Sequence, residues 1–67
     1  MTAERRRRFS GTSNKGELEE ALQQAIEAAK TGLGSELVNW KLLEVHGVNG
    51  GFAGQNDLTA EIEAGVP

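Results

Sequence analysis

The sequence contains no cysteine and no tyrosine, and its 67 residues include one tryptophan, two phenylalanines and one proline. Without cysteine the chain cannot use disulfides to compensate for a small core, and three large rings supply little buried area. A domain of this size buries only about 60% of the surface that its unfolded chain exposes. Because self-association is a common remedy for such a shortage, we expect a homo-oligomer.

Long apolar runs are also missing, since no stretch approaches a signal-peptide core or a membrane span. We therefore expect a soluble, cytoplasmic protein without a membrane partner. The formal net charge of -3 argues against a general nucleic-acid binder, so we expect no nucleic-acid partner.

The one basic feature is the run Arg5 to Arg8. The arginines of this run can bind phosphate groups. More often, such a run is a solvated N-terminal arm or pairs with acids across a sheet, here Glu61 and Glu63. We therefore divide the chain into a basic N-terminal arm at residues 1–8, which can include the start of a first strand, and a single domain at residues 9–67.

Catalytic and metal-binding side chains are scarce. The only histidine is His46, and no cysteine or second histidine is present to complete a metal site with it. The adjacent acids Glu19 and Glu20 fall on the expected solvent face of a helix and not in a cleft. We therefore expect no enzyme and no resident metal, and we interpret His46 as an exposed strand residue.

Residues 16–30, GELEEALQQAIEAAK, carry apolar side chains at spacings of three and four, which predicts one amphipathic helix. Ser13 or Asn14 is expected to cap its start, with Asn14 and Glu17 arranged as a capping box. Gly32 or Gly34 is expected to end it. The apolar stripe consists of Leu18, Ala21, Leu22, Ala25, Ile26, Ala29 and Leu33.

Three strands are expected around this helix. Residues 58–66, LTAEIEAGV, alternate between apolar and polar side chains, which is typical of a strand with one covered face. Residues 37–48 form a second strand, joined to residues 58–66 by a glycine-rich hairpin, and RRRFS forms a short first strand that ends at Gly11. The predicted fold class is α+β: a β-α-β-β chain with a three-stranded antiparallel sheet, in the order 2-3-1, packed on one long amphipathic helix.

The stretch around the single tryptophan, NWKLLEVHGVNGG, has apolar side chains on both faces of the expected strand. Strict alternation places Leu43 and Val45 on one face and Trp40 and Leu42 on the other. Neither choice buries all four in a monomer, and an exposed patch that contains a tryptophan normally marks a contact surface. We therefore expect Trp40 to meet a ligand or another subunit.

The segment SGTS, the helix that follows it, Trp40, a Gly-Val pair with another glycine three residues on, and a final alternating strand together resemble the dodecins, small flavin-binding proteins. The resemblance covers roughly residues 9–66. It implies a dodecameric hollow shell in which a flavin, riboflavin or FMN, stacks against Trp40 near a two-fold axis. The position that resembles the flavin-contacting glutamine of the family is Thr59, expected on the same sheet face as Trp40, and its hydroxyl offers fewer hydrogen bonds than an amide.

Two functions are consistent with these patterns. The first is a small-molecule binding or storage module that sequesters flavin in a homo-oligomeric shell, with Trp40 and Thr59 as the binding residues. The second is a structural or interaction oligomer that keeps a dodecin-like subunit but has lost flavin binding, with Trp40 packed against protein.

Overall fold

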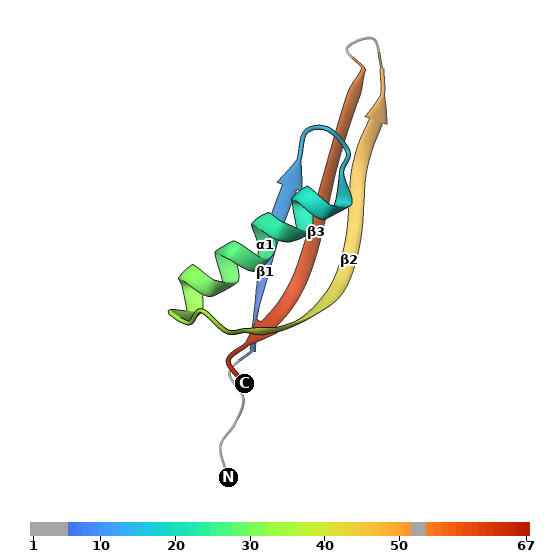
Figure 1. Cartoon of the computed structure of the whole chain (residues 1–67). Helices are drawn as coiled ribbons and strands as arrows, with labels where there is room; N and C mark the ends of the chain where they lie inside the picture. Colours follow the sequence, from blue (N-terminus) through green and yellow to red (C-terminus); the bar gives the residue numbers. More distant parts are fainter. Residues whose placement is uncertain (1–5, 52–53) are drawn as a thin grey trace.

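The computed structural model describes residues 6–51 and 54–67. It contains four elements: β1 (Arg6–Ser13), α1 (Leu18–Leu33), β2 (Asn39–Gly50) and β3 (Gln55–Gly65). β3 lies between β1 and β2 and is antiparallel to both, and α1 crosses one face of the sheet (Figure 1). This confirms the predicted fold class and sheet order. Residues 1–5 of the expected N-terminal arm lie outside the described residues.

The helix packs closely on β1 because small residues line the contact. Ala21, Ala25 and Ala29 of α1 are fully buried. A Cβ added to Gly11 of β1 would lie 2.1 Å from the carbonyl oxygen of Ala21, so only glycine permits this approach of strand to helix. Gly11 thus lies within β1, which runs on to Ser13, and the expected end of the strand at Gly11 is wrong.

The core is a single layer between α1 and the sheet. The predicted alternation in the last strand is confirmed, because Ala60, Ile62 and Ala64 are buried while the residues between them are only partly so. The core cluster consists of Ala25, Ala29, Ile62 and Ala64, with Phe9, Leu22, Ile26 and Leu33 packed against it.

The helix begins without the predicted capping box. The N-cap residue is Glu17, and no side chain caps the first amides of the helix. Instead the Oγ of Ser13 accepts hydrogen bonds from the backbone N–H groups of Lys15 and Glu17, both at 3.1 Å, in the turn that precedes the helix. Ser13 is buried, so it organises the connection between β1 and α1, and Asn14 plays no capping role.

The helix ends at the second of the two expected glycines. Gly34 has φ 65° and ψ 38°, the left-handed conformation that glycine adopts without strain. The backbone N–H of Ser35 then donates to the carbonyl oxygen of Lys30 at 3.1 Å. Arg7 of β1 adds a side-chain contact here, since its Nη1 donates to the carbonyl oxygen of Gly32 at 3.1 Å.

Strand β2 starts and ends later than predicted, and strand β3 begins earlier than predicted. Gly50, Gly51 and Gly54 have positive φ angles, as expected for the residues of the turn that joins the two strands. The hairpin extends beyond the N-terminal end of α1 (Figure 1), and the molecule measures 53 × 18 × 14 Å. Its radius of gyration is 13.6 Å, whereas a compact domain of this length has about 11 Å. The chain is therefore elongated.

The sheet face away from α1 carries charged side chains. Arg8, Glu63 and Lys41 oppose one another across the three strands, and Arg6 Nη1 lies 4.0 Å from Glu63 Oε1. In its described part, the arginine run thus belongs to β1 and pairs with an acid on β3, which was one of the expected alternatives. Among the described residues, no helix has the length and apolar character needed to cross a membrane.

Candidate functional site

The helix-side face of β2 is an apolar part of the sheet that α1 does not cover. α1 packs over β1 and β3, and β2 forms the other edge of the sheet (Figure 1). All 12 residues of β2 are exposed. Trp40 lies on this strand opposite the buried Ala64, yet Trp40 itself is 42% exposed. The chain therefore presents its only tryptophan to the surroundings.

A shift of register at Leu43 decides which β2 side chains lie beside Trp40. The pairing of β2 with β3 changes between Leu42 and Glu44, so that β2 has one more residue than β3 there. Opposed residues of neighbouring strands share a sheet face. The opposed pairs on the helix side are Trp40 with Ala64, Leu42 with Ile62 and Val45 with Ala60. We call Trp40, Leu42 and Val45 the apolar row.

This arrangement differs from strict alternation, which places Val45 on the opposite face from Trp40 and Leu42. The extra residue in β2 reverses the alternation after Leu43, so all three side chains point to the helix side. The signal in the sequence is the adjacent pair Leu42-Leu43, which interrupts the alternation.

The apolar row lies beside the core on the same sheet face, but α1 does not cover it. Its members oppose Ala60, Ile62 and Ala64, which are buried beneath α1. They themselves remain roughly two fifths exposed, with values of 42%, 38% and 40% along the row. An exposed patch of this kind is typical of a contact surface.

Thr59 lies on the other face of the sheet. It opposes Thr12 of β1 and His46 of β2, and its Oγ1 is 3.3 Å from the Oγ1 of Thr12. Trp40 opposes Ala64, an odd number of residues further along β3, and therefore on the opposite face. The expectation that Thr59 shares a face with Trp40 is wrong, and one chain does not bring the two residues together.

His46 is exposed on the same outer face as Thr59. Its Nε2 lies 3.2 Å from Oε2 of Glu61, and Glu44 opposes Glu61 as well. Despite this gathering of two acids and a histidine, the described residues contain no group of histidine, aspartate and glutamate side chains arranged to hold a metal ion. The outer face is a polar surface of paired side chains.

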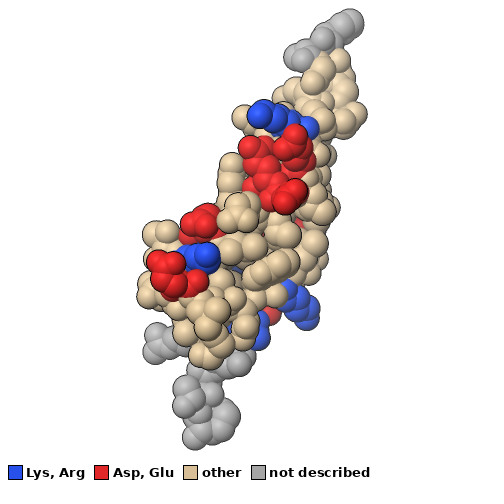
Figure 2. Space-filling model, in the orientation of Figure 1, with Lys and Arg blue, Asp and Glu red and all other residues tan. Residues whose placement is uncertain are grey.

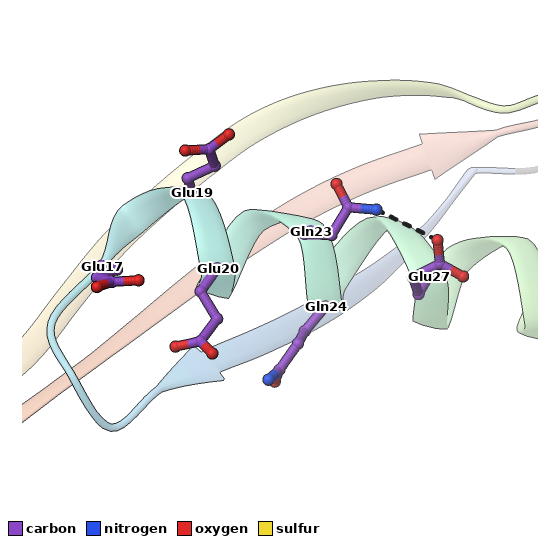
Figure 3. A pocket seen from close by; sticks show the side chains of 6 residues that line it. All are labelled: Glu17, Glu19, Glu20, Gln23, Gln24 and Glu27. Carbon is purple, nitrogen blue, oxygen red and sulfur yellow. Dashed lines mark hydrogen bonds between the residues drawn. The ribbon is translucent and has the colours of Figure 1, made fainter.

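An open depression of about 590 Å³ lies along the outer side of α1. Figure 2 shows acidic side chains gathered in groups on one face of the molecule. Four of the side chains that line the depression form hydrogen bonds. Gln23 Nε2 donates to Glu27 Oε2 at 3.2 Å, Gln24 Oε1 accepts from the backbone N–H of Thr12 at 3.2 Å, and Glu20 Oε1 accepts from Ser13 Oγ at 2.5 Å. Figure 3 shows the carboxylates pointing to different sides of the helix and not toward one point. The lining residues are Glu17, Glu19, Glu20, Gln23, Gln24 and Glu27.

Comparison with protein-family models, with curated proteins and with solved structures gave no match. Of the resemblance to dodecins, the structure bears out the coarser part, a small β-α-β-β fold with a three-stranded antiparallel sheet.

Proposed function

We propose that this chain is the subunit of a homo-oligomer that binds a planar aromatic small molecule of the flavin class against Trp40. The observation that carries the proposal is the uncovered apolar row, in which Trp40 is 42% exposed beside Leu42 and Val45. An indole ring offers a broad face to another ring system, and offset stacking is the usual arrangement of such pairs.

Self-association is the part of the proposal that the fold supports most directly. The subunit has one thin core, an elongated shape and an apolar row that its own helix leaves open. Burial of a large apolar side chain contributes about 1.5–3 kcal/mol, so covering three of them in every copy favours assembly. A dodecameric shell is the form that the resemblance to dodecins implies.

The ligand would be riboflavin or FMN, and the role would be storage or sequestration, since that is what the resemblance to dodecins implies. The apolar row supplies a stacking surface, and its only side-chain hydrogen-bonding group is the indole N–H of Trp40. Because Thr59 of the same chain lies on the other sheet face, any contact from Thr59 to a ring on Trp40 must come from a neighbouring copy.

A second candidate function is a structural or interaction oligomer without a ligand. One observation favours it: the opposed and neighbouring side chains on the face of Trp40 are apolar, including Ala64, Ile62 and Leu42. A flavin binding there would leave the polar edge of its ring without partners from this face. In this alternative, protein from another copy covers Trp40.

Titration of riboflavin, followed by the quenching of its fluorescence, tests the proposal together with light scattering. We expect an oligomer that binds riboflavin, loss of binding in Trp40→Ala, and unchanged binding in the control Leu37→Ala, which removes an exposed side chain outside the row. An oligomer that does not bind riboflavin would support the second candidate function. A mass equal to the 7.2 kDa monomer at micromolar concentration would contradict both.

A further inference from the structure

β2 is an edge strand of unusual character. It has only β3 as a neighbour in the sheet, so the backbone groups on its other side have no strand partner among the described residues. It is 12 residues long, has no proline, and every one of its residues is at least partly open to solvent. The other edge strand, β1, differs because α1 packs on it and buries Gly11 and Ser13. A long, exposed edge with apolar side chains is a template for pairing with another chain.

We propose that β2 pairs antiparallel with β2 of a second copy around a two-fold axis, in the register that sets Lys41 opposite Glu44 of the second copy. The two three-stranded sheets then form one sheet of six strands. This proposal rests on the self-association proposed above and specifies how two copies meet.

The faces of the two strands restrict the register. A two-fold axis perpendicular to the sheet keeps the helix side of one copy on the helix side of the other. Apart from the extra residue Leu43, helix-side residues must therefore oppose helix-side residues. Antiparallel pairing brings the beginning of one β2 against the end of the other. Because the alternation reverses at Leu43, Trp40 and Leu42 can then face residues that follow the shift.

In the proposed register the chemistry of every central pair is complementary. Trp40 opposes Val45 of the second copy, an aromatic and β-branched pair of the kind that stabilises sheets. Lys41 opposes Glu44 of the second copy on the outer face, and symmetry repeats this opposite-charge pair. At the centre Leu42 opposes Leu43 of the second copy.

Other registers lose these pairs. Sliding the strands by two residues sets Lys41 opposite His46 and Trp40 opposite Gly47. This register keeps an apolar pair, Leu42 opposite Val45, but it removes both opposite-charge pairs and leaves Trp40 without a side-chain partner. In a strand without the shift at Leu43, a two-fold axis through Leu43 would set Trp40 opposite His46 and Leu42 opposite Glu44. A bulge often protects an edge from pairing, but here it makes the strand complementary to itself.

The joined sheet also places both helices on one side, with the two apolar rows next to each other between them. Six apolar side chains, three from each copy, then form a continuous surface over the two β2 strands. A planar ring stacked on Trp40 would lie on this surface. The proposed pairing therefore locates the stacking site at a subunit interface, where residues of two copies contribute.

Charge reversal in separate chains tests the register. Lys41→Glu alone sets glutamate opposite Glu44, and Glu44→Lys alone sets lysine opposite Lys41, so each variant should self-associate about tenfold more weakly than the wild type in sedimentation at low salt. An equimolar mixture restores both opposite-charge pairs between unlike chains. We expect the mixture to associate to within about threefold of the wild type.

The mixture of Lys41→Glu and Glu44→Lys chains distinguishes charge pairing between two copies from charge effects within one chain. Lys41 also opposes Glu63, and Glu44 opposes Glu61, but these changes persist in the mixture and cannot produce a recovery. Matched controls are Lys15→Glu and Glu19→Lys, which make the same charge changes at exposed positions away from β2 and should leave association unchanged.

A second measurement does not depend on the charge variants folding alone. Because the chain has no cysteine, a mixture of Lys41→Cys and Glu44→Cys chains should form a disulfide-linked dimer under mild oxidation, whereas either variant alone should not. Two results would overturn the register while leaving self-association standing. One is that the single cysteine variants crosslink as readily as their mixture. The other is that the mixture of charge variants self-associates as weakly as each variant alone. A monomeric wild type would overturn the assembly itself.

Discussion

Trp40 and Thr59 lie on opposite faces of the sheet, because Trp40 opposes the buried Ala64 and Thr59 opposes His46 on the outer side. The two residues therefore cannot contact one ligand within one chain. A site that uses both must combine copies, whereas a site on the apolar row alone relies on Trp40. This relationship determines what substitutions at Thr59 should do.

We expect Thr59→Gln to leave the affinity for riboflavin within about twofold of the wild type. The longer amide points away from the apolar row and pairs with the outer face near Thr12 and His46. Titration of riboflavin into both proteins checks this. A gain of about tenfold, the size of one added hydrogen bond, would show that Thr59 of a neighbouring copy reaches the ring.

We expect the fluorescence emission of Trp40 to report an apolar environment in the native assembly. The ring is 42% exposed in one chain, and it gains apolar burial only when another copy or a ligand covers it. Emission spectra and iodide quenching of the native and urea-unfolded protein measure this. Native emission at the wavelength of indole in water, with full quenching by iodide, would contradict the expectation.

Gly11→Ala should destabilise the fold by about 3 kcal/mol or more, because the new methyl group would meet the carbonyl oxygen of Ala21 at 2.1 Å and force α1 away from β1. The matched control is Gly34→Ala, where nothing lies within 4 Å and only the left-handed backbone costs about 1–2 kcal/mol. Urea unfolding at equal protein concentration compares the two. A smaller loss in Gly11→Ala than in Gly34→Ala would argue against close packing of helix on strand.

Ser13→Ala should lower the free energy of unfolding by about 1–3 kcal/mol, since the backbone N–H groups of Lys15 and Glu17 lose a buried acceptor. The control Ser10→Ala changes the same residue type at an exposed position of β1 and should cost less than about 0.5 kcal/mol. Thermal unfolding followed by circular dichroism measures both. Equal losses would mean that the turn before α1 does not depend on Ser13.

Local patterns in the amino-acid sequence were sufficient to predict the elements and their order. Apolar spacing of three and four from Leu18 to Leu33 requires a helix with one buried stripe, and alternation from Leu58 to Val66 requires a strand with one buried face. Glycines with positive φ at Gly50, Gly51 and Gly54 set the hairpin. These are local properties, so they can be deduced without knowing what packs against them.

Which side chains share a face at the candidate site could not be predicted from such local patterns. The position of Trp40 relative to Val45 and Thr59 depends on how β2 pairs with β3, and one extra residue at Leu43 reverses that relationship for the rest of the strand. The role of Ser13 likewise depends on where α1 begins relative to β1. Register and helix placement arise from contacts between distant segments, and local periodicity carries no information about a bulge until its partner strand is in place.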